Sequence, residues 1–301
     1  MPDTPHPTLN TPLLLIRPAR FGYNAETAVN NAFQQAGGDV QAAAVQEFDA
    51  WVALLRAHDI TLTIIDDTPE PHTPDAIFPN NWISFHGDTA CLYPMFAPNR
   101  RRERKALAEI QRRIPIRHLI DLTHYETQGL FMEGTGSMVL DRQRRIAYAC
   151  LSPRTHPDVL ADFCRQTDYR PLVFHAVDAN GQAIYHTNVM MCVADQYAVV
   201  CLESITDPQE RAQLTDTLTS TGKNIIAISQ KQMACFAGNM LQIQSTAGQP
   251  FLALSSSARR ALTATQQSTL ARYNPLLSSD VQTIERHGGG SVRCMIAEVA
   301  I

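Results

Sequence analysis

The sequence predicts an α/β protein built from five repeated units that close on themselves like a small propeller. A small polar residue opens a short apolar run five times at near-constant spacing, at the positions Asn81, Ser137, Asn188, Asn239 and Ser291. Between these positions the apolar pattern indicates a strand, a second strand, a helix and a third strand. Repetition of such a unit at a nearly fixed period is typical of circular or stacked architectures. The composition, 45% hydrophobic and 18% charged, suits one globular domain spanning residues 1–301.

Before the first repeat the chain supplies two strands and two helices. The apolar runs at 13–16 and 61–65 predict buried strands. A first helix is expected over 25–36, where two glycines break it, and a second over 40–58. The second is better supported because its apolar residues recur at helical spacing. We expect the strand at 13–16 to complete the fifth unit, and residues from 1 to about 12 to form a flexible tail.

The repeats contain the remaining elements. Helices are expected over 157–166, 208–220 and 258–273. Strands are expected at 146–149, 171–177, 197–202, 223–228, 251–254 and 281–284. The last repeat begins with three glycines at 288–290, which we expect to lead directly into a strand with Cys294 at the join, because glycine lets a backbone approach another group closely. The basic run at 100–105 is interpreted as a solvated helix face.

Charge, hydropathy and cysteine usage exclude several classes of protein. The net charge of -4 gives no general affinity for nucleic acid or for an anionic membrane surface. No apolar run reaches the length of about 18 residues that a transmembrane helix needs. The first residues lack the basic start and apolar core of a signal peptide. The seven cysteines contain no C-x-x-C pair, which argues against a disulfide framework or a thiolate zinc site. These features predict a cytoplasmic protein.

Closure of the units around an axis brings equivalent positions together at the centre. Glu133, His186 and Cys294 then meet from three different units. A thiol, an imidazole and a carboxylate are the groups that nucleophilic catalysis needs, because the thiolate attacks while the imidazole moves the proton. Each residue taken alone is more often structural, and a cysteine in an apolar run usually belongs to the core. Their shared place in the repeat is what favours a catalytic site.

Several motifs of the chain resemble those of the amidinotransferase and arginine deiminase superfamily, and most closely its citrulline-utilisation hydrolase branch. They are FPNNW at 78–82, EGTGS at 133–137, HTN at 186–188 and GGGSVRCM at 288–295, together with IRP at 16–18 and FGYN at 21–24. The resemblance implies the pentein fold, a five-bladed pseudo-symmetric α/β propeller. It also implies that Cys294 is the nucleophile, His186 the general acid and base, and Glu133 a substrate-binding carboxylate.

Two positions depart from the pattern of the arginine-cleaving relatives. Those relatives usually hold the guanidinium with aspartates, whereas this chain has Asn81 and Asn188. A guanidinium is cationic and only donates hydrogen bonds, so it favours carboxylate partners. A ureido group is neutral and offers a carbonyl acceptor as well as N–H donors, which an asparagine amide can match. The two asparagines therefore favour citrulline, although Asp75 and Glu133 leave a cationic substrate open.

The expected activity is hydrolysis of citrulline to ornithine, ammonia and carbon dioxide, without a metal or an organic cofactor. Arg17 is a candidate partner for the substrate's α-carboxylate because a guanidinium pairs well with a carboxylate, although a structural ion pair explains it equally well. Further substrate-binding candidates are Asn24, Asp75 and Asn80. The alternatives are an arginine deiminase or dihydrolase, an amidinotransferase and a non-catalytic binder of a small molecule. Apolar strand edges and helix faces are compatible with a homodimer.

Overall fold

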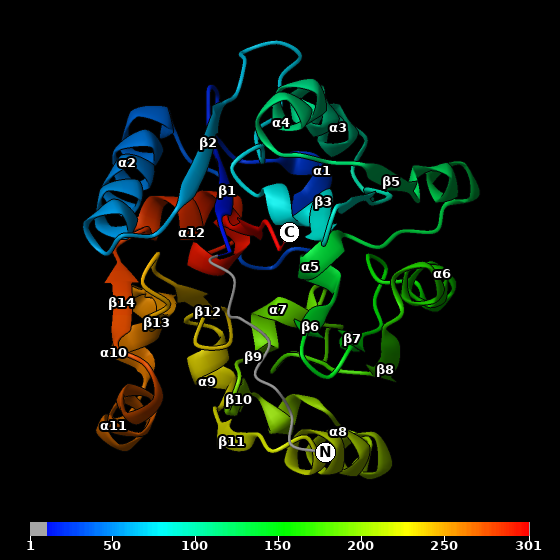
Figure 1. Cartoon of the computed structure of the whole chain (residues 1–301), viewed down its shortest axis with the longest axis vertical. Coiled ribbons are helices and arrows are strands. Elements are labelled where there is room, and N and C mark those ends of the chain that lie inside the picture. The colour runs from blue at the N-terminus through cyan, green and yellow to red at the C-terminus, as the bar shows by residue number, and fades with distance from the viewer. Residues whose placement is uncertain (1–10, 301) are drawn as a thin grey trace.

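The computed structural model describes residues 11–300, and the five predicted units correspond to five separate three-stranded sheets. The sheets follow one another in chain order around the middle of the molecule (Figure 1). In each sheet the middle strand pairs antiparallel with one neighbour and parallel with the other. The expected tail at about residues 1–12 falls mostly on residues 1–10, which lie outside the described residues.

One sheet joins the two ends of the chain, and the other four are each built from consecutive strands. The joining sheet contains β15 (Ala297–Glu298), β1 (Leu13–Arg17) and β2 (Leu62–Asp66). The second and third contain β3 (Ile83–His86), β4 (Thr89–Leu92) and β5 (His118–Asp121), then β6 (Val139–Asp141), β7 (Ile146–Cys150) and β8 (Arg170–Phe174). The last two contain β9 (Met191–Val193), β10 (Tyr197–Val200) and β11 (Asn224–Ala227), then β12 (Leu241–Gln244), β13 (Pro250–Ser255) and β14 (Leu276–Ser279). The prediction that strand 13–16 completes the fifth unit is confirmed.

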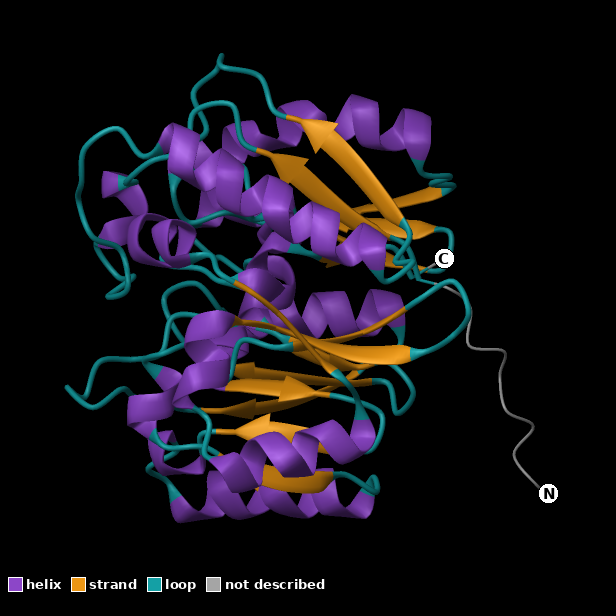
Figure 2. Ribbon diagram, turned by 90° about the vertical axis from the view of Figure 1, so that its left-hand side faces the viewer, coloured by secondary structure: helices purple, strands orange, loops and turns teal. Residues whose placement is uncertain are grey.

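Each parallel pair of strands is joined by a helical crossover, as parallel pairing requires. The crossover helices lie along the outer side of the sheets (Figure 2). They are α1 (Ala25–Ala28), α2 (Gln41–Ala57), α3 (Pro98–Arg101), α4 (Leu107–Arg113), α6 (Pro157–Thr167), α8 (Pro208–Ser220), α10 (Ser256–Ala261) and α11 (Ala264–Tyr273), with the 3-10 turn η2 (Arg102–Ala106). A further 3-10 turn, η3 (Thr123–Gln128), follows β5. The middle strands β7 and β10 are buried along their whole length, as expected for the central strand of a sheet that is covered on both faces.

The sequence suggested that the polar residues marking the repeat open strands, but in the structure they do not. Four of them lie in or beside single helical turns that precede the inner strands: η1 (Pro79–Asn81), α5 (Gly134–Ser137), α7 (Thr187–Met190) and η5 (Val292–Met295). The fifth, Asn239, lies in a loop before β12. The turns contact one another, α5 touching both η1 and α7, and η1 touching η5. This contact gathers the central residues of different units at one place.

Three other expectations were wrong. The first helix ends at Ala28 instead of continuing to residue 36. The helix expected over 258–273 is two helices, because Thr263 begins α11 with a capping box to Gln266. The segment 281–284 belongs not to a strand but to the start of α12 (Gln282–Gly288), which buries Ile284 and ends at the left-handed Gly289. Cys294 accordingly lies in a 3-10 turn rather than at a strand start.

The helices expected at 40–58, 157–166 and 208–220 are confirmed. Two short elements complete the description, α9 (Gln230–Met233) and η4 (Leu202–Ser204). Within residues 11–300, every helix is too short or too polar to cross a lipid bilayer.

Candidate active site

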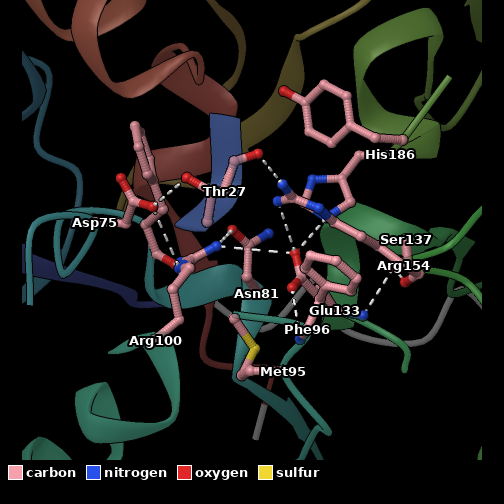
Figure 3. A network of polar contacts seen from close by, with 12 residues as sticks. Thr27, Asp75, Asn81, Met95, Phe96, Arg100, Glu133, Ser137, Arg154 and His186 are labelled. Atoms are coloured by element: carbon pink, nitrogen blue, oxygen red, sulfur yellow. Dashed lines mark hydrogen bonds and ion pairs between the residues drawn. The ribbon is translucent and has the colours of Figure 1, made fainter. Parts of the chain in front are cut away.

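A small pocket lies where the helical turns of the repeats meet. Its lining includes the proposed nucleophile and base, two further predicted residues, and two buried arginines: Cys294, His186, Asp75, Asn81, Arg100 and Arg154. Glycines 288–290, Tyr185 and Phe78 form much of the remaining wall. Figure 3 shows how the polar side chains point toward one another across this space. The prediction that central positions of different units converge is therefore confirmed for the residues that line the pocket.

The sulfur of Cys294 is held by two amide groups. Cys294 is only 5% exposed, and its Sγ accepts hydrogen bonds from Asn239 Nδ2 at 3.2 Å and from Asn188 Nδ2 at 3.5 Å. Gly290 makes room for this arrangement, because a Cβ there would lie 3.2 Å from the Cβ of Cys294 and 2.8 Å from the ring of Phe78. The thiol is thus placed beside open space at the wall of a polar pocket.

His186 and Glu133 form a tight buried pair. His186 Nε2 lies 2.7 Å from Glu133 Oε2, and the other carboxylate oxygen accepts from the backbone N–H of Phe96 at 3.1 Å. Burial lowers the pKa of His186 to about 4, although the Glu133 carboxylate opposes this shift. Burial alone would raise the pKa of Glu133, but Arg154 and His186 together hold it well below its ordinary value. The pair therefore consists of a neutral imidazole and an ionised carboxylate at neutral pH.

Arg100 contacts more than one side chain of the polar network. The sequence did not indicate this role. The basic run 100–105 was expected to be a solvated helix face, but Arg100 is buried and pairs with Glu103 through two hydrogen bonds of 2.8 and 3.0 Å. Its Nη1 donates to Asn81 Oδ1 at 2.7 Å. Two more carboxylates lie nearby, Asp75 at 3.8 Å and Glu133 at 3.9 Å. Only Arg102 of the run is exposed.

Arg154 is the second buried arginine that sequence reasoning missed. Its guanidinium donates to Glu133 Oε2 at 3.3 Å, to the carbonyl of Thr27 at 2.6 Å and to Asn30 Oδ1. It also lies over the ring of Tyr185, 5.2 Å from the centroid, where a cation is attracted to the aromatic face. Arg154 stands alone in a loop after β7, and no local pattern distinguishes it from a solvated arginine.

The two asparagines of the site are each fixed in orientation. Asn81 Oδ1 accepts from Arg100, which turns its Nδ2 toward Gly136 and His186. Asn188 donates its Nδ2 to the sulfur of Cys294. Within residues 11–300, Asn81 Nδ2 and Asn188 Oδ1 are both buried without a hydrogen-bond partner. Of the two, Asn81 lines the pocket, whereas Asn188 lies outside the lining and contacts Cys294.

Asp75 and Asn24 occupy the side of the pocket away from Glu133. Asp75 Oδ2 accepts from Asn24 Nδ2 at 2.7 Å and from Thr27 Oγ1 at 3.2 Å. Its Oδ1 is buried and has no partner within the described part of the chain. Burial raises the pKa of Asp75, while Arg100 opposes the shift. Asn24 therefore reaches the site through Asp75 rather than by lining the pocket.

Five predicted residues do not line the pocket. Three of them contact residues that do: Glu133 bonds to His186, Asn188 to Cys294 and Asn24 to Asp75. The other two are Arg17 and Asn80. Arg17 does not line it: its side chain is 39% exposed and makes two hydrogen bonds of 2.8 Å to Asp49, which is the structural ion pair weighed as its alternative. Asn80 is buried beside the pocket without lining it, and within residues 11–300 its side-chain atoms have no hydrogen-bond partner. The arginines that line the pocket are Arg100 and Arg154.

The acidic, thiol and imidazole side chains of residues 11–300 contain no group of three or more that is arranged to hold a metal ion. The charged groups of the pocket instead pair with one another. What the arrangement offers is a thiol beside two amide donors, a proton carrier held by a carboxylate, and two guanidinium groups facing a second carboxylate. These are the groups of a covalent hydrolysis of a small charged substrate.

The family model described as N,N dimethylarginine dimethylhydrolase, eukaryotic, matches residues 17–301. None of the curated proteins compared with the chain matches it. Among solved structures, full-length ArgZ, an arginine dihydrolase from the ornithine-ammonia cycle in cyanobacteria, has a TM-score of 0.78 at 15% identity and covers 96% of this chain. This chain spans 40% of the length of full-length ArgZ.

Two further structures are similar over nearly their whole length. The substrate-bound mutant of the N-terminal domain of ArgZ gives a TM-score of 0.78 at 15% identity, over 96% of this chain and 98% of that one. A mutant dimethylarginine dimethylaminohydrolase, solved as an adduct with S-methyl-L-thiocitrulline, gives 0.69 at 15% identity, over 96% and 100%. These identities show a shared fold. Because the family model covers nearly all of the sequence, the chain belongs to the N,N dimethylarginine dimethylhydrolase family of the amidinotransferase and arginine deiminase superfamily.

Proposed function

We propose that the protein is a cysteine-dependent hydrolase that cleaves a carbon–nitrogen bond of a ureido or guanidino amino acid, with citrulline as its preferred substrate. The products are ornithine, ammonia and carbon dioxide. The family match supports the reaction class. One observation carries the preference for a ureido group: Asn81 and Asn188 each have one side-chain atom occupied by a protein group and the other left for a ligand.

The two unpaired atoms differ in kind. Asn81 offers a donor, because Arg100 already binds its oxygen. Asn188 offers an acceptor, because its N–H group already faces the sulfur of Cys294. A ureido group has a carbonyl oxygen for the donor and an N–H group for the acceptor, so it matches both. A guanidinium carries only N–H groups and leaves the Asn81 donor unpaired, at a cost of about 1–3 kcal/mol for a buried group.

The charged groups of the pocket suit the other end of an amino acid. Arg100 and Arg154 are buried guanidinium groups in the pocket wall, and a planar guanidinium pairs well with a carboxylate. Asp75 has one carboxylate oxygen without a partner in residues 11–300, and it can accept from an ammonium group. We therefore assign the α-carboxylate to the arginines and the α-ammonium group to Asp75.

The proposed reaction runs through a covalent intermediate. Cys294 attacks the ureido carbon, and the N–H of Asn81 holds the oxygen that becomes negative. His186 takes up the thiol proton as the sulfur attacks and delivers it to the departing side-chain nitrogen, so that ornithine leaves and a carbamoyl thioester remains on the sulfur. A water then attacks the thioester, with His186 accepting its proton, and carbamate leaves as the sulfur regains a proton. Carbamate breaks down to ammonia and carbon dioxide. Glu133 stabilises the imidazolium that forms in each half of the cycle.

Arginine-type substrates are the second candidate, and the comparisons favour them. The family is described by its action on N,N dimethylarginine, and ArgZ by its action as an arginine dihydrolase. In this chain the ionised Glu133 is the acidic group nearest to His186, and it would favour a cation. Arginine would then lose ammonia in a first hydrolysis and be cleaved again as citrulline. Transfer of the amidino group to an amine uses the same covalent intermediate and differs only in its acceptor.

One assay separates these candidates. The purified protein is incubated with citrulline, arginine or dimethylarginine, each with and without an added amine acceptor, and ornithine, citrulline, dimethylamine and ammonia are quantified. We expect ornithine from citrulline and no product with Cys294→Ala. Accumulation of citrulline from arginine without ornithine would contradict the ureido preference. Turnover of none of the three substrates would favour the remaining alternative, a non-catalytic binder.

Three further expectations remain proposals. The five sheets are inferred to close as the blades of a propeller, which places the pocket on its axis. A homodimer is proposed from the apolar edges, and light scattering of the purified protein tests it. A cytoplasmic location is proposed from the composition, and fractionation of cells that express the protein tests it.

A further inference from the structure

The sulfur of Cys294 receives hydrogen bonds from two successive units of the fold. Asn188 belongs to the third repeat position and Asn239 to the fourth, and both side-chain amides donate to Sγ, at 3.5 and 3.2 Å. Asn239 is the nearer donor, is fully buried and is absent from the lining of the substrate pocket. Like Asn188, it contacts the sulfur from outside that lining, but unlike Asn188 it has both its side-chain oxygen and its side-chain nitrogen bonded within the protein.

The orientation of the Asn239 amide is fixed from both sides. Its Oδ1 accepts from the backbone N–H of Arg293 at 3.1 Å. Its Nδ2 donates to the backbone carbonyl of Asn188 at 2.9 Å as well as to the sulfur. Turning the amide over would place oxygen against oxygen and N–H against N–H. The side chain of Asn239 must therefore present an N–H group to Cys294. Arg293, whose backbone N–H fixes the amide oxygen, is the residue directly before Cys294.

Two N–H donors aimed at one sulfur favour the thiolate over the thiol. An anionic acceptor forms shorter and stronger hydrogen bonds than a neutral one, so donors stabilise the charged form. The imidazole of His186 is engaged with Glu133 instead. Within residues 11–300, the hydrogen bonds to Cys294 Sγ come from these two amides alone. The groups that donate hydrogen bonds to the sulfur are thus neutral amides.

We propose that Asn239 is a positioning residue that holds the sulfur of Cys294 in the pocket and, with Asn188, stabilises its thiolate form. This inference rests on the proposed function only in that Cys294 is the nucleophile. The substrate is immaterial to it.

The reactivity of the thiol can be measured without any substrate. The protein is alkylated with iodoacetamide between pH 5 and 10, and the modification of each cysteine is followed by peptide mass spectrometry. The alkylation rate follows the fraction of thiolate, so its pH dependence reports the ionisation of each cysteine. Cys235 is the exposed cysteine of the described chain and serves as an internal reference in every sample.

Asn239→Ala removes the donor, and Asn239→Asp replaces it by a carboxylate. For both variants we expect the pH of half-maximal Cys294 alkylation to rise by at least about one unit. At a fixed pH well below that midpoint, the variant then contains about tenfold less thiolate than the unmutated protein. That of Cys235 should stay unchanged. The kcat should fall at least tenfold while KM changes little, because Asn239 does not line the pocket. The control is Asn274→Asp, because Asn274 is also buried, accepts from Tyr197 and donates to a backbone carbonyl, far from the sulfur.

An unchanged alkylation profile of Cys294 in a folded Asn239 variant overturns the proposal. Should neither variant fold, the unmutated protein decides. In a pH titration followed by ¹⁵N NMR, the side-chain NH₂ signals of two asparagines should shift with the same midpoint as the alkylation of Cys294. Both shifts should be absent in Cys294→Ala. One such asparagine or none would refute the inference. If alkylation behaves as expected while no substrate is turned over, the proposed function fails and this inference stands.

Discussion

In the proposed reaction, His186 is the residue whose protonation state sets the pH range of activity. It is buried between a carboxylate and two arginines, and burial lowers its pKa to about 4. A base must be unprotonated to accept a proton, so the imidazole is ready to act at any pH well above that value. The nearby Glu133 then stabilises the imidazolium that forms transiently during the reaction.

This gives a prediction for the pH profile of activity. The acidic limb of kcat/KM should have its midpoint near pH 4 and not near the ordinary histidine value of about 6.5. Stability falls in the same direction: the folded pKa lies below the unfolded one, so the unfolded chain binds the proton first as pH falls from 6.5 to 4. Circular dichroism at each pH must therefore confirm that the protein is folded. An acidic limb centred near pH 6.5 contradicts the assignment.

Arg100 gives a second prediction, about stability. Arg100→Met leaves Glu103 and Asp75 as buried carboxyls without their cation, which typically costs about 3–5 kcal/mol. Burial already raises the pKa of Glu103 to about 7 despite Arg100, so protonation relieves the loss. Denaturant unfolding should show a larger deficit for the variant at pH 8 than at pH 5.5. The control Arg102→Met changes an exposed residue and should stay within about 0.5 kcal/mol. Equal deficits at both pH values would contradict this account.

At the scale of single elements, the helical turns position the site because they pass close to one another. Gly136 in α5 is an example: a Cβ there would lie 2.4 Å from Asn81 Nδ2 and 2.9 Å from His186 Nδ1. Gly136→Ala must therefore push both side chains aside. We expect at least a tenfold loss of kcat with only about 1–3 kcal/mol of destabilisation. Gly38→Ala is the matched control, because a Cβ there meets nothing within 4 Å. An unchanged kcat in Gly136→Ala would show that the turn can accommodate a Cβ without displacing Asn81 and His186.

The elements also show why part of the site could be predicted and part could not. The repeat spacing alone predicted that Glu133, His186 and Cys294 occupy equivalent positions. This inference did not depend on the local conformation of the backbone. It could not separate a strand start from a single helical turn, since both bury short apolar runs. Likewise, Val281 and Ile284 are three residues apart and fit one face of α12 as well as a short strand. The burial of Arg100 could not be predicted, because Glu103 within the run pairs with it but Asn81, Asp75 and Glu133, which surround it, are distant in sequence.

On the scale of the whole molecule, the site exists only because every unit contributes to it. Asn81, Glu133, His186, Asn239 and Cys294 come from five successive repeat positions, and each touches another unit: η1, which carries Asn81, contacts α5 and η5, and the other four bond to one another across units. The last unit is completed by the joining sheet, where β1 lies between β15 and β2. The nucleophile therefore depends on the pairing of the two ends of the chain.

A truncated chain that ends at Ile296 tests this dependence, because it keeps Cys294 and removes β15. The truncation exposes the partners of the buried Ala297 and Val299 and breaks the bonds from Val299 to Pro12 and from Gly87 to Ala300. Burial of one valine and a few hydrogen bonds together contribute about 3–6 kcal/mol. The melting temperature should fall by at least about 5 °C, and activity at least tenfold, because η5 loses its anchor.

Cys294→Ala is the control for this truncation, since it removes the nucleophile and leaves β15 in place. It should melt within about 3 °C of the unmodified chain while losing all activity. The two variants then separate loss of chemistry from loss of the fold that positions it. If the truncated chain melts like the unmodified one and stays active, the turn that carries Cys294 is held by its contacts with η1 and β13 alone. In that case the joining of the two ends stabilises the first sheet without serving the site.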